Sequence, residues 1–191
     1  MGQVVSPREM LSRRGEWKET GEGVVCAYGA FDLLHPGHVR ILEQARDFGS
    51  VLAVAVQSDE LVRAAAARAS GHSGIDAYME IQPPITPAAE RAEIVAALRA
   101  VDAATVVDAT LEEFLKLVQP DVFVCGGQRP QNAGAFRGPR EPAAEMENSA
   151  SKGSNELDRI VAAIGCRLVR LPIEPGYSTS RLIERISGQR A

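Results

Sequence analysis

Two of the three histidines in this chain lie three residues apart in the stretch GAFDLLHPGH, residues 29–38. The stretch follows an apolar run that is typical of a buried strand, and a helix is expected to begin near Gly37. Backbone N–H groups at a helix start bind anions, and glycine lets a phosphate approach where a side chain would obstruct it. His35 and His38 would project to similar places there, and their ring N–H groups could donate to phosphate oxygens. These residue types favour a phosphate site.

On the residues alone, a zinc site and a chance pairing of the two histidines also stay open. Paired histidine ligands of zinc on a helix are usually spaced i, i+4, and no third ligand cluster is evident, so the spacing disfavours a metal pair. Two histidines within four positions can also arise by chance, as ordinary surface or core residues.

Composition narrows the class of protein. The 191 residues fit one domain, and the formal net charge of −4 gives no general attraction to nucleic acid or to an anionic membrane. Three widely spaced cysteines indicate buried, reduced thiols rather than disulfides or a zinc site. The first residues lack the apolar centre of a signal peptide, and no apolar run approaches the roughly 20 residues of a membrane span. We therefore expect a cytoplasmic protein.

Periodicity alternates between strand and helix along the chain. This alternation, with apolar strands, predicts an α/β fold: a Rossmann-like, doubly wound parallel sheet in a single domain. Ligands of such sheets bind beyond the carboxyl ends of the strands, where residues 29–38, 125–128 and 173–180 are expected. The predicted strands are 23–29, 51–57, 104–108, 121–127 and 167–172, and the predicted helices are 37–48, 59–68, 88–99, 111–118, 154–164 and 179–187.

The opening stretch resembles the G-x-F-D-x-x-H-x-G-H signature of the cytidylyltransferase-like nucleotidyltransferases. Three further segments, 85–107, 120–127 and 171–186, are similar to later motifs of that superfamily, and their order and spacing agree best with the heptose-1-phosphate adenylyltransferase domain of lipopolysaccharide biosynthesis. The resemblance implies an N-terminal leader over 1–22 and a nucleotidyltransferase domain over 23–191. Long loops are expected at 69–87 and 128–152, the second either disordered or a lid.

The resemblance also implies roles for the residues that match. His35 and His38 would contact the triphosphate and stabilise charge at its α-phosphate, and Asp32 would help to fix the loop. Arg91, with Arg63, would bind the phosphate of the acceptor, and Asp102 would be structural or lie near the base. The other nucleotide-binding candidates are Gly29, Ala30, Phe31, Gly37, Gly126 and Gly127, with Ser178, Thr179 and Ser180 capping the last helix and holding the β- and γ-phosphates.

The implied reaction needs no protein nucleophile. A sugar-phosphate or alcohol-phosphate oxygen would attack the α-phosphorus of ATP or CTP in line, and pyrophosphate would leave. Catalysis would consist of positioning and charge stabilisation, with Mg²⁺ or another divalent metal on the phosphates. The resemblance further implies a homodimer, while the net charge and the lack of a long apolar run lead us to expect neither nucleic acid nor a membrane as a partner.

Several departures from the family pattern remove positive charge. Cys125 stands where similar proteins have lysine, Ile173 stands where cytidylyltransferases often have arginine, and the almost cation-free segment 64–87 replaces a basic stretch. Two alternatives therefore stay open: a cytidylyltransferase acting on a polyol or phosphonate, and a catalytically silent nucleotide-binding relative. The arginines that could compensate are Arg63, Arg68, Arg129 and Arg181.

Overall fold

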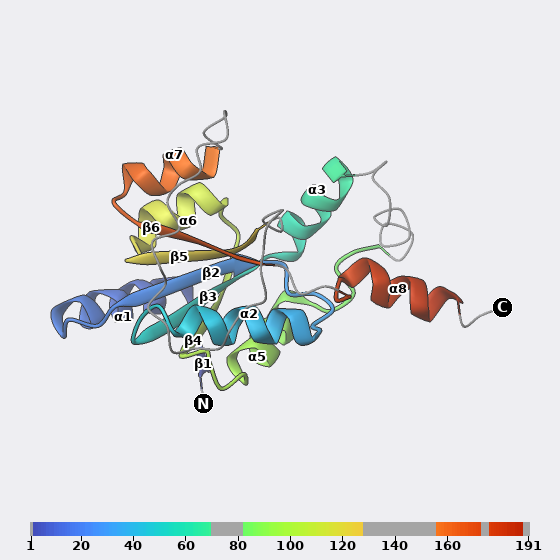
Figure 1. The fold of residues 1–191 in the computed structure, drawn as a ribbon, viewed down its shortest axis with the longest axis horizontal. Coiled ribbons are helices and arrows are strands. Elements are labelled where there is room, and N and C mark those ends of the chain that lie inside the picture. The colour runs from blue at the N-terminus through green and yellow to red at the C-terminus, as the bar shows by residue number, and fades with distance from the viewer. Residues whose placement is uncertain (1, 70–81, 128–155, 173–175, 189–191) are drawn as a thin grey trace.

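A computed structural model gives the fold and describes residues 2–69, 82–127, 156–172 and 176–188 (Figure 1). Within these ranges, all strands join one parallel sheet in the order β1-β4-β3-β2-β5-β6. The strands are β1 Gln3–Val4, β2 Val24–Gly29, β3 Val51–Gln57, β4 Ala103–Val107, β5 Val122–Gly127 and β6 Arg167–Pro172. The helices are α1 Pro7–Glu19, α2 Pro36–Arg46, α3 Asp59–Ala69, α5 Ala88–Ala96, α6 Leu111–Val118, α7 Glu156–Ala163 and α8 Thr179–Gly188.

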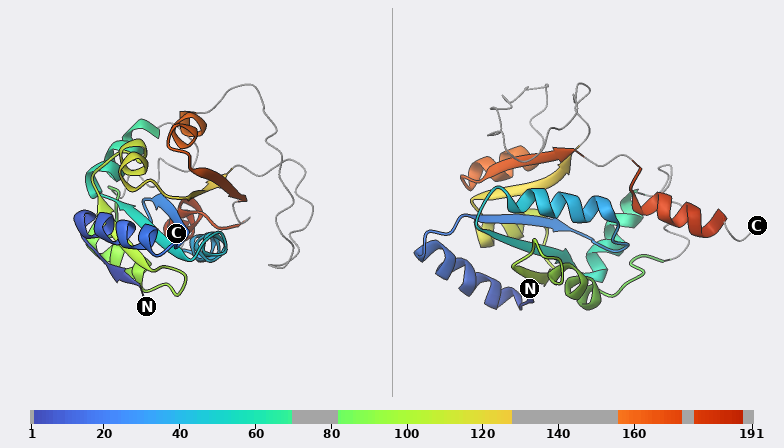
Figure 2. Two further views of the ribbon diagram at one scale, coloured as in Figure 1. Left: turned by 90° about the vertical axis from the view of Figure 1, so that its left-hand side faces the viewer. Right: turned by 60° about the horizontal axis from the view of Figure 1, so that its bottom comes forward.

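Helices cover both faces of the sheet. Figure 2 shows α2 on one side of the strands and α1 and α6 on the other. Successive side chains of a strand point to opposite faces, so each strand contributes to two cores. In β2, Val25 and Ala27 pack in the core with α2 and α5, whereas Val24 and Cys26 pack in the core with α1, α6 and α7. This confirms the predicted single-domain, Rossmann-like parallel fold.

The order of strands reverses between β2 and β5. β3 and β4 lie on one side of β2, whereas β5 and β6 lie on the other. β2 pairs with β5 only as far as Ala27 and Val124; beyond that point β2 stays beside β3 to Gly29, and β5 stays beside β6 to Gly127. The two strands therefore part at their carboxyl ends, which is where doubly wound sheets bind ligands.

Residues 3–19, within the expected leader, form part of the same layered structure. β1 extends the sheet beside β4, and α1 is capped by Ser6, whose hydroxyl oxygen accepts a hydrogen bond from the backbone N–H of Glu9. Met10 of α1 is 1% exposed and lies in the core with α6 and α7. The periodicity argument missed both elements, because β1 has two residues and α1 carries few apolar ones.

The other described elements lie within three residues of their predicted bounds. Figure 1 shows α8 beyond the carboxyl-end edge of the sheet rather than on one of its faces. Of the two predicted loops, 69–87 and 128–152, residues 70–81 of the first and all of the second lie outside the described residues. The expectation that 128–152 is disordered or a lid therefore stays a prediction. None of the described helices is long and apolar enough to cross a membrane.

Replacement of Met10 by alanine tests whether α1 is integral to the fold. The substitution removes a fully buried side chain from the core and should lower the free energy of unfolding by about 2–5 kcal/mol, measured by urea denaturation. Arg8→Ala, at an exposed position of the same helix, is the matched control and should change it by about 0.5 kcal/mol or less. Equal stabilities of the two variants would contradict this packing.

Candidate active site

The turn after β2 carries the first part of the site. Phe31 has a φ of 51°, a left-handed conformation that costs energy in a residue with a Cβ, and its ring is buried. The ring lies over Gly29, where an added Cβ would be 3.2 Å from Phe31 Cε2. A side chain at position 29 would therefore require the Phe31 ring to shift by a few tenths of an ångström, which favours glycine.

Asp32 holds this turn against the segment that precedes α5. Its two carboxylate oxygens accept hydrogen bonds from the backbone N–H groups of Ile85 and Thr86, both at 2.8 Å. Such charge-assisted bonds are stronger than neutral ones, and here they join segments more than fifty residues apart in the sequence. The expected loop-fixing role of Asp32 is confirmed, whereas a contact with nucleotide stays a prediction.

Arg91 completes the same junction from within α5. Its side chain is 0% exposed, and its guanidinium donates to the carbonyl oxygens of Ala30 and Thr86 and to Asp59 Oδ1, the last at 2.6 Å. A buried cation requires such partners, because desolvation without them is very costly. Arg91 thus ties the turn after β2 to the start of α3 and to the segment before α5.

This geometry corrects the role that the family resemblance suggested for Arg91. An acceptor phosphate cannot reach a guanidinium without exposed surface, so the structure gives Arg91 a positioning role. Asp102 is structural as well, since its carboxylate accepts from the backbone N–H of Leu52 at 2.8 Å and pairs with Arg46 at 3.2 Å.

The two histidines meet at the start of α2. His35 precedes the helix in an extended conformation, and its backbone N–H donates to Nδ1 of His38 at 3.4 Å. The rings stack with centroids 3.9 Å apart, and the His38 ring also lies 5.7 Å from that of Phe31. Because Nδ1 of His38 accepts, its Nε2 carries the proton and can donate. Nδ1 of His35 is buried without a hydrogen-bond partner.

Burial keeps both imidazoles neutral. It lowers the pKa of His35 below its ordinary value, and it lowers the pKa of His38 to about 4, with a further contribution from the nearby His35. Two stacked rings cannot readily both be charged, because like charges at this distance repel. The pair therefore offers neutral donors at pH 7.

The start of α8 lies against the start of α2. An added Cβ at Gly37 would be 3.0 Å from the His35 ring and 3.2 Å from Cβ of Tyr177, so a side chain at this position would require these neighbours to shift. Ser178 caps α8, because its hydroxyl oxygen accepts from the backbone N–H of Arg181 at 3.2 Å. The predicted cap is confirmed for Ser178. Thr179 begins the helix, and the side chain of Ser180 lies outside the described residues.

The glycines of β5 end the strand on the far side of the parting. Gly126 and Gly127 pair with Leu171 and Pro172 of β6, and Cys125 precedes them. Their contact with a nucleotide stays a prediction, as does that of Gly29, Ala30 and Phe31.

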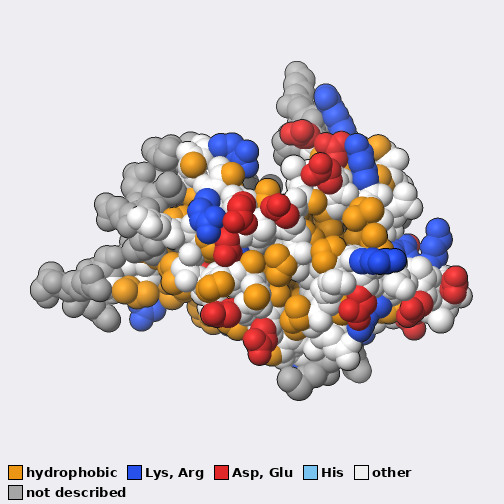
Figure 3. Space-filling model, turned by 180° about the vertical axis from the view of Figure 1, so that it is seen from behind, with side chains coloured by type: hydrophobic (Ala, Val, Ile, Leu, Met, Phe, Trp, Pro, Cys, Tyr) orange, Lys and Arg blue, Asp and Glu red, His pale blue; other side chains and the backbone are white. Residues whose placement is uncertain are grey.

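The compensating arginines fall in three places. Arg63 and Arg68 are exposed on α3, where Arg63 contacts Glu60 at 3.4 Å, and Arg181 is exposed on α8. Arg129 lies outside the described residues. The space-filling view of Figure 3, which shows the molecule from behind relative to Figure 1, has basic and acidic side chains interspersed on the visible face. Anion binding must therefore depend on local groups, and the acceptor-binding role of Arg63 stays a prediction.

The described residues do not provide a protein cage for a metal. Within the ranges that the structure covers, no three His, Cys, Asp or Glu side chains are grouped so that they could hold an ion. Mg²⁺ commonly keeps several waters and is bound through substrate phosphates with one or two carboxylates. An ion bound in this way does not need a cluster of protein ligands.

Three residues at this site were not singled out from the sequence. Asp59 neutralises Arg91, Tyr177 lies 6.3 Å from the His35 ring, and Arg40 lies over the Tyr177 ring. Tyr177 could have been noticed as the neighbour of Ser178. The other two contacts join residues that are distant in sequence, and no periodic pattern marks them.

Replacement of Arg91 tests its positioning role. Arg91→Ala leaves Asp59 and two carbonyl oxygens without their donor and should lower the free energy of unfolding by about 3–5 kcal/mol. Arg91→Lys keeps the charge but not the planar, forked guanidinium. Its free energy of unfolding should lie between those of the unmodified protein and Arg91→Ala. The exposed Arg63→Ala is the control and should leave stability within about 0.5 kcal/mol, as measured by urea denaturation. A fully stable Arg91→Ala protein with weakened acceptor binding would instead support an acceptor-binding role for Arg91.

The neutral state of His38 predicts a pH dependence of stability. Its pKa falls from 6.5 in the unfolded chain to about 4 in the folded one, so between these values the unfolded chain binds the extra proton. The free energy of unfolding should decrease as the pH falls through this window and should not depend on His38 above it. His38→Asn keeps an acceptor near the position of Nδ1 without titrating there, so its unfolding curves should shift less. Parallel pH profiles for the two proteins would show that the pKa is not lowered.

Comparison with known proteins agrees with this geometry. The family model described as Cytidylyltransferase-like matches residues 26–185. The bifunctional protein HldE of Koribacter versatilis is 35% identical over 96% of this chain and 31% of its own length, and that of Rhodopseudomonas palustris strain BisB5 is 33% identical over 95% and 30%. The chain thus spans about a third of these relatives.

A solved structure shows the same fold. It is the lipopolysaccharide core biosynthesis protein from Thermoplasma volcanium, which superposes with a TM-score of 0.51 at 22% identity and covers 81% of this chain and 98% of its own. The family match includes the turn after β2, both histidines and the start of α8. The chain belongs to the cytidylyltransferase-like family.

Proposed function

We propose that this chain is a nucleotidyltransferase that transfers a nucleoside monophosphate from ATP or CTP to a phosphorylated sugar or alcohol and releases pyrophosphate. The observation that carries the proposal is the stacked pair of neutral histidines at the start of α2, where β2 and β5 part. A helix start and two ring donors make a site for anionic oxygens, and the family membership supports a nucleotide phosphate as the anion.

The histidines would act as fixed donors. His38 is oriented by the backbone N–H of His35, so its Nε2–H is available to a phosphate oxygen. Nδ1 of His35 is buried, so it is not the atom of this ring that meets a ligand. Donors that are already oriented stabilise the charge that develops at the α-phosphate without reorganisation.

The chemistry is a direct displacement. A phosphate oxygen of the acceptor forms a bond to the α-phosphorus, the bond to the bridging oxygen of the β-phosphate breaks, and pyrophosphate carries the electron pair away. A covalent cysteine intermediate is disfavoured, because burial raises the pKa of the thiols of Cys26 and Cys125, and that of Cys166 to about 11. Positioning and charge stabilisation would supply the rate enhancement.

A divalent metal such as Mg²⁺ would come with the triphosphate and neutralise part of its charge. In this proposal the triphosphate lies against His35, His38 and the hydroxyl-bearing start of α8 at Ser178. They bind and orient the phosphates, while the Asp32 and Arg91 junction holds the turn in place.

The finer proposal is that ATP is the donor and heptose 1-phosphate the acceptor, in lipopolysaccharide biosynthesis. It is supported by the resemblance to the heptose branch and by the HldE relatives, which match almost the whole of this chain. The departures at Cys125 and Ile173 keep two other functions in view: a cytidylyltransferase acting on a polyol or phosphonate, and a nucleotide-binding protein without catalysis.

A pyrophosphate-release assay tests the activity. The protein should turn over ATP or CTP with Mg²⁺ and one member of a panel of sugar phosphates and alcohol phosphates. His38→Asn and His38→Gln retain different halves of the imidazole's hydrogen bonding, at Nδ1 and at Nε2 respectively. Loss of the Nε2 donor in His38→Asn should lower kcat by about 100-fold or more, and His38→Gln should retain more activity.

The same assay separates the alternatives. If no acceptor supports turnover while ATP or CTP still raises the melting temperature, the chain is a silent binder. If neither nucleotide changes the melting temperature, the nucleotidyltransferase proposal fails. Turnover of a polyol or phosphonate acceptor with CTP alone would replace the heptose proposal.

A further inference from the structure

Tyr177 joins the two helix starts of the site through aromatic contacts. The planes of the Tyr177 and His35 rings are 23° apart, and their centroids are separated by 6.3 Å. The guanidinium carbon of Arg40 lies 5.3 Å from the centroid of the Tyr177 ring. The ring thus has a neutral imidazole near one part and a cation near another. A guanidinium at this distance from an aromatic face is attracted by the ring's negative face, which restricts where it can lie.

The helix geometry directs Arg40 toward the phosphate site. Long side chains of an α-helix lean toward its N-terminus, so Arg40, in the second turn of α2, reaches back over the first turn. Gly37 lies one turn earlier on the same face and touches Tyr177. The guanidinium is therefore held beside residue 177, directly before the Ser178 cap of α8.

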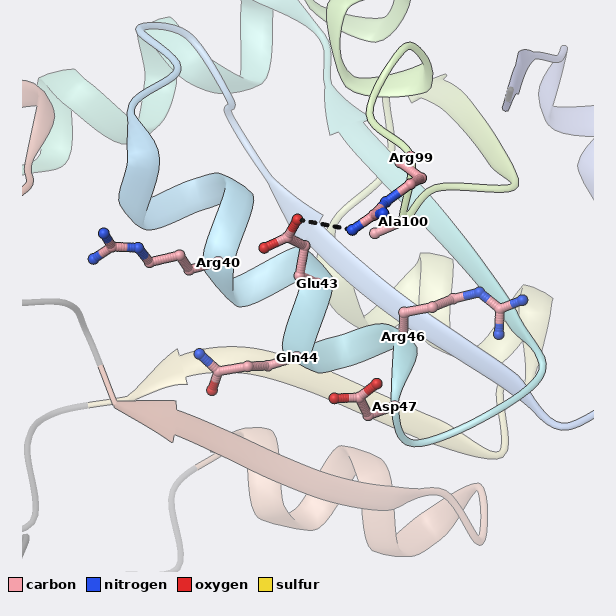
Figure 4. A pocket seen from close by; sticks show the side chains of 7 residues that line it. All are labelled: Arg40, Glu43, Gln44, Arg46, Asp47, Arg99 and Ala100. Carbon is pink, nitrogen blue, oxygen red and sulfur yellow. Dashed lines mark ion pairs between the residues drawn. The ribbon is translucent and has the colours of Figure 1, made fainter. Parts of the chain in front are cut away.

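Arg40 differs in direction from the other arginines around α2. An open hollow of about 450 Å³ runs along the outer surface of this helix and is lined by Arg40, Arg46 and Arg99 among others. Figure 4 shows Arg40 extending from α2 to the side opposite Arg46, while Arg99 pairs with Glu43 at 3.9 Å. Among these three, only Arg40 is held by the aromatic ring next to Ser178.

The contact between Arg40 and Tyr177 places a positive charge where a bound triphosphate would need one. A triphosphate carries several negative charges, whereas Cys125 of β5, where the family resemblance leads us to expect a lysine, supplies none. The histidines are neutral and Arg91 is buried, so neither supplies an accessible positive charge. A guanidinium can bind two phosphate oxygens at once, and one that is already placed by a ring loses less entropy when it does so.

We propose that Arg40, held on the Tyr177 ring, binds the β- or γ-phosphate of the nucleotide and stabilises the departing pyrophosphate. This inference rests on the proposed function. It adds a residue outside the histidine motif and the serine-threonine motif, and it assigns to Tyr177 the role of a positioning residue.

Calorimetric binding of ATP, CTP, AMP and CMP to the full chain tests the assignment. Arg40→Ala should weaken binding of the preferred triphosphate by about 10- to 100-fold and leave binding of its monophosphate within about twofold. A structural defect would weaken both. Arg99→Ala, an exposed arginine of the same hollow, is the matched control and should bind both nucleotides like the unmodified protein.

Tyr177 variants test the platform. Tyr177→Phe keeps the ring and should bind the triphosphate nearly as well as the unmodified protein, whereas Tyr177→Leu should bind it several-fold more weakly. If Tyr177 acts through Arg40, adding Tyr177→Leu to Arg40→Ala should cause little further loss. Independent, additive losses would overturn the positioning role.

The outcomes separate this proposal from the one it rests on. If the unmodified protein binds ATP or CTP and Arg40→Ala binds it equally well, the Arg40 assignment is wrong and the nucleotidyltransferase proposal stands. If the unmodified protein binds neither nucleotide, both proposals fall together.

Discussion

The buried guanidinium of Arg91 is the constraint on which the rest of the site depends. It is fully enclosed, and its charge is balanced by Asp59 while its other donors are bound by the carbonyl oxygens of Ala30 and Thr86. Asp32 acts in the opposite sense, accepting from two backbone N–H groups of the same segment. The turn after β2 is thus held by the cation of Arg91, bound to its carbonyl oxygen at Ala30, and by the anion of Asp32, bound to the segment before α5. The left-handed conformation of Phe31 and the placement of His35 follow from that fixed turn.

This arrangement puts rigid neutral groups where the substrate's charge is expected. The imidazoles of His35 and His38 stay uncharged because burial penalises their protonated forms. A neutral donor binds a phosphate oxygen more weakly than a cation does. Its hydrogen bond strengthens as negative charge builds on that oxygen, so it stabilises the transition state more than the bound substrate. In the proposed reaction, positive charge would come from a metal on the nucleotide and from Arg40, which lies over the Tyr177 ring.

The fold was largely predictable because its physical basis is local. Buried parallel strands need continuous apolar runs, and covering helices need one apolar face, so both leave a periodic record in the sequence. β1 and α1 escaped prediction for the same reason: a two-residue strand has no period, and α1 buries little beyond Met10. β1 is placed by pairing with β4, and α1 is placed by contacts with α6; both partners lie far along the chain.

The features of the site can be separated in the same way, into those set by local sequence and those set by long-range contacts. The sequence by itself determined that the histidine motif follows a strand and opens a helix, that glycines in it allow a close approach of the backbone, and that a serine caps the last helix. These are consequences of short-range backbone geometry. Only the tertiary structure decided that Arg91 is enclosed rather than exposed to an acceptor, and that Tyr177 joins His35 to Arg40. Burial and long-range contacts depend on which segments meet at the carboxyl ends of the strands, and no pattern within a single segment records that meeting.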